Sequence, residues 1–339
     1  MKPYRFLIFF LAAAILFSCK KNNGDTPILP SDLVLDAVVN PDNSGNVSFT
    51  ASATNAVSFE YDYGDGTFAA VPSGSVTHKY GESGTYTVKV TAKSATGNTL
   101  TVSKQVTVTV IMKLVWSDEF DAPGAPDPTK WGYDLGAGGW GNSELQYYTN
   151  RLDNAEVSNG TLKITAKKES YSGSNYTSAR LLTKDKFSFK YGKVEARAKL
   201  PEGVGTWPAF WMLGSNIATV SWPACGEIDI MEHLGRDLNK IYSTLHYPGH
   251  SGGSGTGSTT MISGATTDFH VYAAEWKASS IVFSVDGNPF FTFPNNGTLP
   301  FNQNFFIILN VAIGGNFGGT VDPAFTSGVM EVDYVRVYQ

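Results

Sequence analysis

Charge is scarce in this sequence. Lysine, arginine, aspartate and glutamate make up 16% of its 339 residues, whereas soluble proteins typically have about 25%. The formal net charge is -5, and no basic stripe stands out. This composition argues against a nucleic-acid partner, because proteins that bind phosphate backbones carry a basic excess. An uncharged ligand fits better, and the few charges can be reserved for function.

Long hydrophobic runs are also lacking. The apolar run from Phe6 to Phe17 has twelve residues, and a membrane-spanning helix needs about 20. Because Lys2 and Arg5 precede this run, the layout predicts a secretory signal peptide over residues 1–18. No spanning helix is therefore expected at this end of the chain.

The end of the predicted signal, LFSC at residues 16–19, resembles the lipobox that the lipoprotein signal peptidase cuts. This resemblance implies that Cys19 becomes a lipidated N-terminus, followed by a flexible tether over residues 19–31. The protein is then extracytoplasmic and anchored in a membrane, at the outer membrane or cell surface. The alternative is an ordinary signal peptide with an incidental cysteine.

Cysteine is rare, since Cys225 is the only one besides Cys19. After the predicted cleavage, the mature chain can form no intramolecular disulfide with an unmodified partner. We expect Cys225 to be a small buried thiol, because no adjacent residue pattern would activate it.

Glycine and aromatic residues are abundant, with 35 Gly, 21 Phe, 16 Tyr and 7 Trp. Few long helical patterns are visible, so this composition favours a loop-rich all-β protein. Residues 32–110 are rich in Val, Thr and Ser and contain short alternating segments, which predicts a small β-sandwich. Residues 113–339 have longer alternating strands without βαβ spacing, which favours a jelly-roll β-sandwich of two sheets.

Within the first segment, YDYGDGT (61–67) and HKYGESGTYTVKV (78–90) resemble the PKD domain, an immunoglobulin-like module. Modules of this kind usually space or orient a partner domain. Asp62 and Asp65 have a structural explanation, because Asp-Gly suits a tight turn. We therefore assign no chemistry to this segment.

The stretch GEIDIMEHLG (226–235) concentrates three acids in an otherwise apolar run. In a regular strand Glu227 and Asp229 share a face, whereas Glu232 points to the other. A β-bulge near Ile230 and Met231 would reset the alternation and return Glu232 to the shared face. Two carboxylates with different protonation states are what acid-assisted attack on an acetal requires. The residue pattern alone leaves exposed acids on a strand edge as an equal alternative.

The longer stretch WPACGEIDIMEHLG (222–235) resembles the active-site strand of family 16 glycoside hydrolases. GTWPAFWMLG (205–214), GGWGNSELQYYT (138–149) and LNVAIGGNFGG (309–319) resemble its flanking motifs. The resemblance implies that Glu227 is the nucleophile, Glu232 the general acid/base and Asp229 the assisting acid. The bulged E-x-D-x-x-E spacing, with STLHYPG (243–249), is most similar to laminarinases, which cleave β-1,3-glucan.

The same resemblance implies a set of substrate-binding residues. Tryptophan faces suit stacking on sugar rings, and polar side chains would bind hydroxyl groups. The set is Asn142, Glu144, Arg180, Trp207, Trp211, Trp222 and His246. We expect His233 and His270 to be structural.

A calcium ion away from the cleft is common in this family. The resemblance places its ligands at Glu119, at the backbone carbonyl of Gly160 and at Asp333. Oxygen ligands from distant segments suit a hard cation of this kind. No cofactor is expected for catalysis.

Together these features predict a retaining endo-β-1,3-glucanase that is monomeric, acts on a polysaccharide and binds no nucleic acid. Hydrolysis of mixed-linkage glucan or of an agar-type galactan stays open, because the bulge alone does not specify the sugar. A non-catalytic surface glycan-binding protein is the alternative from another class. It would have no reason to keep an acid/nucleophile pair.

Overall fold

The computed structural model describes residues 28–339. The predicted signal peptide and Cys19 lie outside these residues. The chain divides between Ile111 and Met112 into two compact units, each with its own hydrophobic core. In the described part of the chain, no helix has the length and apolar character that crossing a membrane would take.

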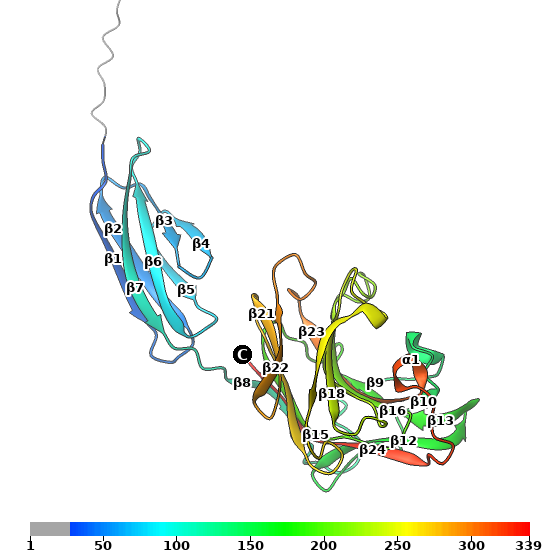
Figure 1. Ribbon diagram of the computed structural model, residues 1–339. Coiled ribbons are helices and arrows are strands. Elements are labelled where there is room, and N and C mark those ends of the chain that lie inside the picture. The colour runs from blue at the N-terminus through cyan, green and yellow to red at the C-terminus, as the bar shows by residue number, and fades with distance from the viewer. Residues whose placement is uncertain (1–27) are drawn as a thin grey trace, which may run out of the picture. The chain divides into compact units, whose positions relative to one another are not determined.

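The first unit is a sandwich of two antiparallel sheets (Figure 1). Its strands are β1 (Ser31–Val39), β2 (Asn46–Thr54), β3 (Ser58–Asp62), β4 (Phe68–Val71), β5 (Ser75–Lys79), β6 (Gly84–Lys93) and β7 (Thr99–Val108). One sheet has the order β1-β2-β5 and the other β4-β3-β6-β7. The β3–β4 turn is stabilised by Asp62 and Asp65, whose Oδ1 atoms accept hydrogen bonds from the backbone N–H groups of Gly64 and Thr67. These bonds support the structural explanation of both acids.

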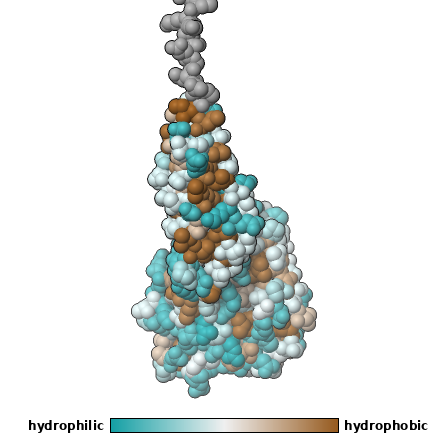
Figure 2. All heavy atoms as spheres, turned by 90° about the vertical axis from the view of Figure 1, so that its left-hand side faces the viewer, coloured by the Kyte–Doolittle hydropathy of each residue, from teal (hydrophilic) through white to brown (hydrophobic). Residues whose placement is uncertain are grey.

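Some apolar side chains of the first unit reach solvent. Val34 and Val38 on β1 are 50% and 67% exposed, and Figure 2 shows hydrophobic residues on the face of this unit that it displays. β1 is an edge strand of its sheet, so these residues lie beside an unpaired strand edge.

The second unit is built from two larger sheets that enclose the main core, so the predicted all-β jelly-roll sandwich is confirmed (Figure 1). Its strands are β8 (Leu114–Asp118), β9 (Gly132–Asp134), β10 (Gln146–Tyr148), β11 (Ala155–Ser158), β12 (Thr161–Tyr171), β13 (Ser174–Ser178), β14 (Arg180–Leu182), β15 (Gly192–Lys199), β16 (Thr206–Gly214), β17 (Glu227–His233), β18 (Lys240–His246), β19 (Thr256–Met261), β20 (His270–Trp276), β21 (Ser280–Val285), β22 (Asn288–Pro294), β23 (Phe305–Ile313) and β24 (Ser327–Tyr338). The helical segments are short: η1 (Gly139–Gly141), η2 (Gly252–Ser254) and α1 (Gly315–Gly318).

The ten-stranded sheet has the order β10-β13-β12-β24-β15-β20-β21-β22, with β11 paired to β12 and β8 to β24. The seven-stranded sheet has the order β19-β18-β17-β16-β23-β14-β9. In β16, Phe210 and Met212 enter the core between the sheets, whereas Trp207 and Trp211 alternate with them and line a cleft. This period-two alternation gives the seven-stranded sheet one apolar face and one functional face.

Candidate active site

The acidic strand β17 contains the predicted bulge. Against β16, Phe210 pairs with Met231 and the next residue, Trp211, pairs with Asp229, which leaves Ile230 unpaired. The pairing with β18 shifts over the same interval, between Asp229 and Glu232. Ile230 and Met231 both pack in the core, so Glu232 returns to the face of Asp229.

Strand pairing places three polar residues and one alanine in a row across the cleft face. Glu232 lies opposite Ala209, Ala209 opposite Asn310, and Asn310 opposite Arg180. Neighbouring strands are about 4.8 Å apart. The row therefore joins residues from the four strands β17, β16, β23 and β14.

These residues line a cleft of about 380 Å³. Its lining includes the three acids and every substrate-binding residue expected from the sequence, namely Asn142, Glu144, Arg180, Trp207, Trp211, Trp222 and His246. The further lining residues are Trp140, Gly141, Ala209, Leu213, Gly252, Asn310 and Ala312. Among the residues that sequence reasoning missed, Trp140 and Asn310 carry polar groups that the cleft can use.

Two tryptophans donate hydrogen bonds to the carboxylates of Glu227 and Glu232. The indole N–H of Trp222 donates a 3.0 Å hydrogen bond to Glu227 Oε2, and that of Trp207 donates a 2.9 Å bond to Glu232 Oε1. Thr244 also donates to Glu232 Oε2, at 3.3 Å. Each carboxyl group is therefore oriented by a donor from a neighbouring segment.

Burial shifts the titration of all three acids. Desolvation and the Asp229 carboxylate raise the pKa of Glu227 well above its ordinary value, while His246 and Arg180 act in the opposite direction. Desolvation and the Glu232 carboxylate likewise raise the pKa of Asp229. Desolvation also raises the pKa of Glu232, against the effect of the Trp207 hydrogen bond. The cluster therefore retains protons at pH values where exposed carboxylates have lost theirs.

His246 lies beside the acids because it is opposite Glu227 in the β17–β18 pairing. Its Nε2 atom is 3.2 Å from Asp229 Oδ2 and 3.7 Å from Glu227 Oε1. Gly255 packs against the ring, and a Cβ atom at this position would lie 2.6 Å from His246 Cε1. A glycine at 255 is therefore required for this position of the imidazole.

Glu144 is held by a set of donors on the far side of the cleft. Its carboxylate accepts hydrogen bonds from Asn142 Nδ2, Gln146 Nε2 and Tyr148 OH, at 3.2, 2.6 and 3.1 Å. Asn310 Nδ2 donates to the same Tyr148 hydroxyl at 3.1 Å. Polar bonds thus connect Glu144 to the row of residues on the seven-stranded sheet.

Arg180 lies between two tryptophan rings. Its guanidinium carbon is 4.7 Å from the centroid of Trp211 and 5.3 Å from that of Trp140, and its Nε atom is 3.0 Å from Asp134 Oδ2. The indole N–H of Trp211 donates to Asn310 Oδ1 at 2.7 Å. This packing fixes a cationic group and a flat aromatic face in the same wall of the cleft.

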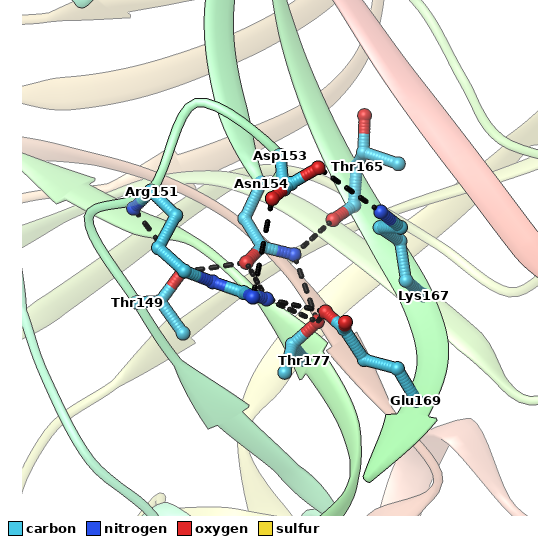
Figure 3. Close-up of polar contacts among 8 residues, drawn as sticks. All are labelled: Thr149, Arg151, Asp153, Asn154, Thr165, Lys167, Glu169 and Thr177. Atoms are coloured by element: carbon cyan, nitrogen blue, oxygen red, sulfur yellow. Dashed lines mark hydrogen bonds and ion pairs between the residues drawn. The ribbon is translucent and has the colours of Figure 1, made fainter. Parts of the chain in front are cut away.

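A buried polar network anchors the segment that follows β10 (Figure 3). The Asn154 amide oxygen accepts bonds from Thr149 Oγ1 and Arg151, at 2.5 and 3.0 Å. Its amide nitrogen donates to Thr165 O and Thr177 Oγ1, both at 3.0 Å. Strand β10, which carries Gln146 and Tyr148, is therefore attached to β12 and β13.

Strand pairing brings the three positions expected to bind calcium to one stretch of β24. β12 pairs with β24 up to Val332, and β8 pairs from Val335 onward, with Asp118 opposite Val335. Asp333 lies between these two pairings, near the ends of the segments that carry Glu119 and Gly160. However, both carboxylates already have partners, since Glu119 accepts two hydrogen bonds from Arg336 and Asp333 Oδ2 one from Arg197. An ion held here would have to replace at least part of this arginine pairing.

The remaining sequence expectations concern residues away from the cleft. His233 is fully buried, and His270 Nδ1 lies 2.7 Å from Asp286; neither lines the cleft. Cys225 is a free buried thiol, as expected, and burial raises its pKa to about 11.

Comparisons with known proteins agree with this geometry. Residues 142–336 match the family model of glycosyl hydrolases family 16, and residues 31–110 match a PKD domain model. The chain is 48% identical over 243 residues to a beta-glucanase of Rhodothermus marinus. The alignment covers 67% of this chain and 85% of that protein.

Solved structures of laminarinases are also similar to this chain. The laminarinase from Rhodothermus marinus is similar with a TM-score of 0.65 and 48% identity, over 68% of this chain and 98% of that one. A LamA variant from Z. galactanivorans, crystallised with laminaritriose and laminaritetraose, is similar with a TM-score of 0.63 and 44% identity, over 67% of this chain and 98% of that one.

Proposed function

Because the chain belongs to family 16 of the glycosyl hydrolases, we propose that it is a retaining endo-β-1,3-glucanase acting on β-glucans such as laminarin. The observation that carries this proposal is the bulge of β17, which places Glu227, Asp229 and Glu232 together in a cleft lined by tryptophans. The named similarities to a beta-glucanase and to laminarinases support the choice of glucan.

The mechanism is a double displacement. Glu232 donates its proton to the leaving glycosidic oxygen while Glu227 attacks the anomeric carbon and forms a glycosyl ester. Glu232 then takes a proton from a water molecule, and the resulting hydroxide releases the sugar from Glu227. Desolvation raises the pKa of Glu232, and this direction favours the protonated form that its role as the acid requires.

Asp229 lies between Glu227 and Glu232 in the strand and assists their acid–base chemistry. Its buried carboxyl group is like-charged with both neighbours, so the three groups do not all ionise together. His246 and Arg180 favour the ionised form of Glu227, which is the form that attacks. The surrounding indole rings supply flat faces on which glucose rings stack.

The proposal is tested by reducing-end release from laminarin, mixed-linkage glucan and agarose in parallel. We expect release from laminarin, and Glu227→Gln is expected to fold normally and lose at least about 1000-fold in kcat, because it removes the nucleophile. Proton NMR should show the β anomer first, and an initial α anomer would contradict retention.

The other outcomes separate the alternatives. Release from agarose but not laminarin would assign a galactan substrate. Binding of laminarin without release from any polysaccharide would support a glycan-binding protein. Substantial turnover by Glu227→Gln would place the nucleophile elsewhere.

We further propose a structural calcium ion held by Glu119, the Gly160 carbonyl and Asp333. The proximity of their segments along β24 supports it. If the ion is bound, EDTA should lower the Tm of the second unit and added Ca²⁺ should restore it. An identical Tm with EDTA and with Ca²⁺ would contradict this site.

A further inference from the structure

The acids and the histidine of the cleft have a second chemical capability besides glycoside hydrolysis. In the part of the chain that the structure describes, Glu227, Asp229 and His246 form the one group of three or more acidic, histidine or cysteine residues whose ligand atoms converge. One oxygen or nitrogen from each lies within 4.8 Å of the other two. Carboxylate oxygens and imidazole nitrogens are each among the ligands that Zn²⁺ takes in proteins.

Two of these side chains have unused polar atoms. Among residues 28–339, Asp229 Oδ2 and His246 Nδ1 are buried and have no hydrogen-bond partner. Asp229 is only 4% exposed, and this oxygen lies within ion-pair distance of His246 Nε2, at 3.2 Å. Burying a carboxylate oxygen without a hydrogen bond costs free energy. Coordination of this oxygen to a bound cation would offset that cost.

The spacing agrees with a small cation. Ligand atoms about 2.0–2.1 Å from a tetrahedral Zn²⁺ ion lie about 3.3 Å from one another. His246 Nε2 is 3.2 Å from Asp229 Oδ2 and 3.7 Å from Glu227 Oε1. The nitrogen ligand favours Zn²⁺ or Cu²⁺ over Ca²⁺ and Mg²⁺, which prefer oxygen.

We propose that Glu227, Asp229 and His246 form a binding site for a divalent transition-metal ion of the Zn²⁺ type, which competes with glucan for the cleft. The competition follows because the ion would coordinate Glu227, the side chain that must attack the sugar. A fourth coordination position would face the cleft and hold water. Only the competition depends on the proposed function; the metal site itself depends on the three side chains.

The first test is isothermal titration calorimetry of the purified full-length protein with ZnCl₂ in a buffer that does not bind metal. We expect one site per chain, lost in His246→Gln. The matched control is His250→Gln, because His250 lies on the same hairpin but outside the cleft. This control is expected to keep both Zn²⁺ binding and activity. Zn²⁺ binding that survives in His246→Gln, or no binding by the unmodified protein, would overturn the proposal.

The second test needs no variant and so does not depend on how His246→Gln folds. With laminarin as substrate, Zn²⁺ at about ten times its Kd should raise the apparent KM about tenfold and leave kcat unchanged, and EDTA should reverse the effect. A fall in kcat at unchanged KM would show that zinc acts outside the cleft. If laminarin is not hydrolysed at all, the proposed function fails, while the calorimetric test still decides the metal site.

Discussion

At the scale of single residues, Asp229 is a buried carboxyl group that lies beside other acids in the cleft. It is 4% exposed, and burial together with the Glu232 carboxylate raises its pKa. An acid whose pKa is raised on folding destabilises the native state as pH rises from its unfolded value toward its folded value. Ionisation of Asp229 therefore lowers the stability of the fold.

We expect Asp229→Asn to lose activity and to gain thermal stability. The gain should be small near pH 3, below the pKa of about 3.9 of an unfolded aspartate, and should grow toward neutral pH to about 2–4 °C in Tm, the equivalent of about 1 kcal/mol for a domain of this size. Scanning calorimetry at several pH values measures it.

The control is Asp185→Asn, which changes an exposed carboxylate at a positive φ that asparagine tolerates. We expect it to change Tm much less. A gain for Asp229→Asn that is the same at every pH would show that charge is not its cause.

The sequence predicted the cleft residues on and beside β16 and β17 better than those on the other segments that line the cleft. The alternation of the strand predicted the bulge that brings the three acids together, whereas the cleft positions of Trp207, Trp211 and Trp222 were implied by the family resemblance. Trp140 was missed because it lies in the three-residue segment η1 with φ +49°, which no periodicity describes. Asn310 could have been found, since it is the one polar residue in the buried strand FFIILNVAI.

At the scale of elements, the position of β10 depends on the network around Asn154. This side chain is fully buried, and its amide makes all four of the hydrogen bonds described above. Its removal would leave several of those partners unsatisfied away from water. The network is therefore a stability element that also supports the Glu144 side of the cleft.

We expect Asn154→Ala to lower the free energy of unfolding by about 2–3 kcal/mol and to raise KM more than it lowers kcat, because Glu144 would lose its fixed position. Urea denaturation and steady-state kinetics measure both effects. The control, Asn304→Ala, alters an exposed amide and should change stability by about 0.5 kcal/mol or less. Equal destabilisation by both variants would contradict a special role for Asn154.

The calcium positions show a limit of sequence reasoning at the same scale. The order of the strands could not be predicted from the sequence. The arginines that β24 and the adjacent strands place beside each carboxylate could therefore not be predicted either. The structure pairs Glu119 with Arg336 and Asp333 with Arg197, and neither pairing leaves a trace in residue spacing.

At the scale of the whole molecule, the two units have separate cores and separate family matches. The glucanase relatives cover about two thirds of the chain, so they give no function for the first unit. We propose that it serves as a spacer between the catalytic unit and a lipid anchor at Cys19, which lies outside the described residues.

The anchor predicts how the protein fractionates. Cys19→Ser should move the protein from the membrane pellet to the soluble fraction without changing kcat on laminarin, because one side chain would carry the lipid. Detergent phase partition and fractionation measure this, with Ser18→Ala as a control that keeps a small residue beside the cleavage site. A Cys19→Ser protein that stays in the membrane pellet would contradict lipid anchoring.

The bulge of β17 has a consequence for how this strand can change over evolutionary time. Because Ile230 and Met231 both point into the core, deleting one of them would restore a regular alternation and still leave all three acids on the cleft face. Elsewhere in a strand, loss of one codon would turn every later side chain to the opposite face. The catalytic strand therefore contains two adjacent residues, Ile230 and Met231, either of which could be lost while the three acids stay on one face.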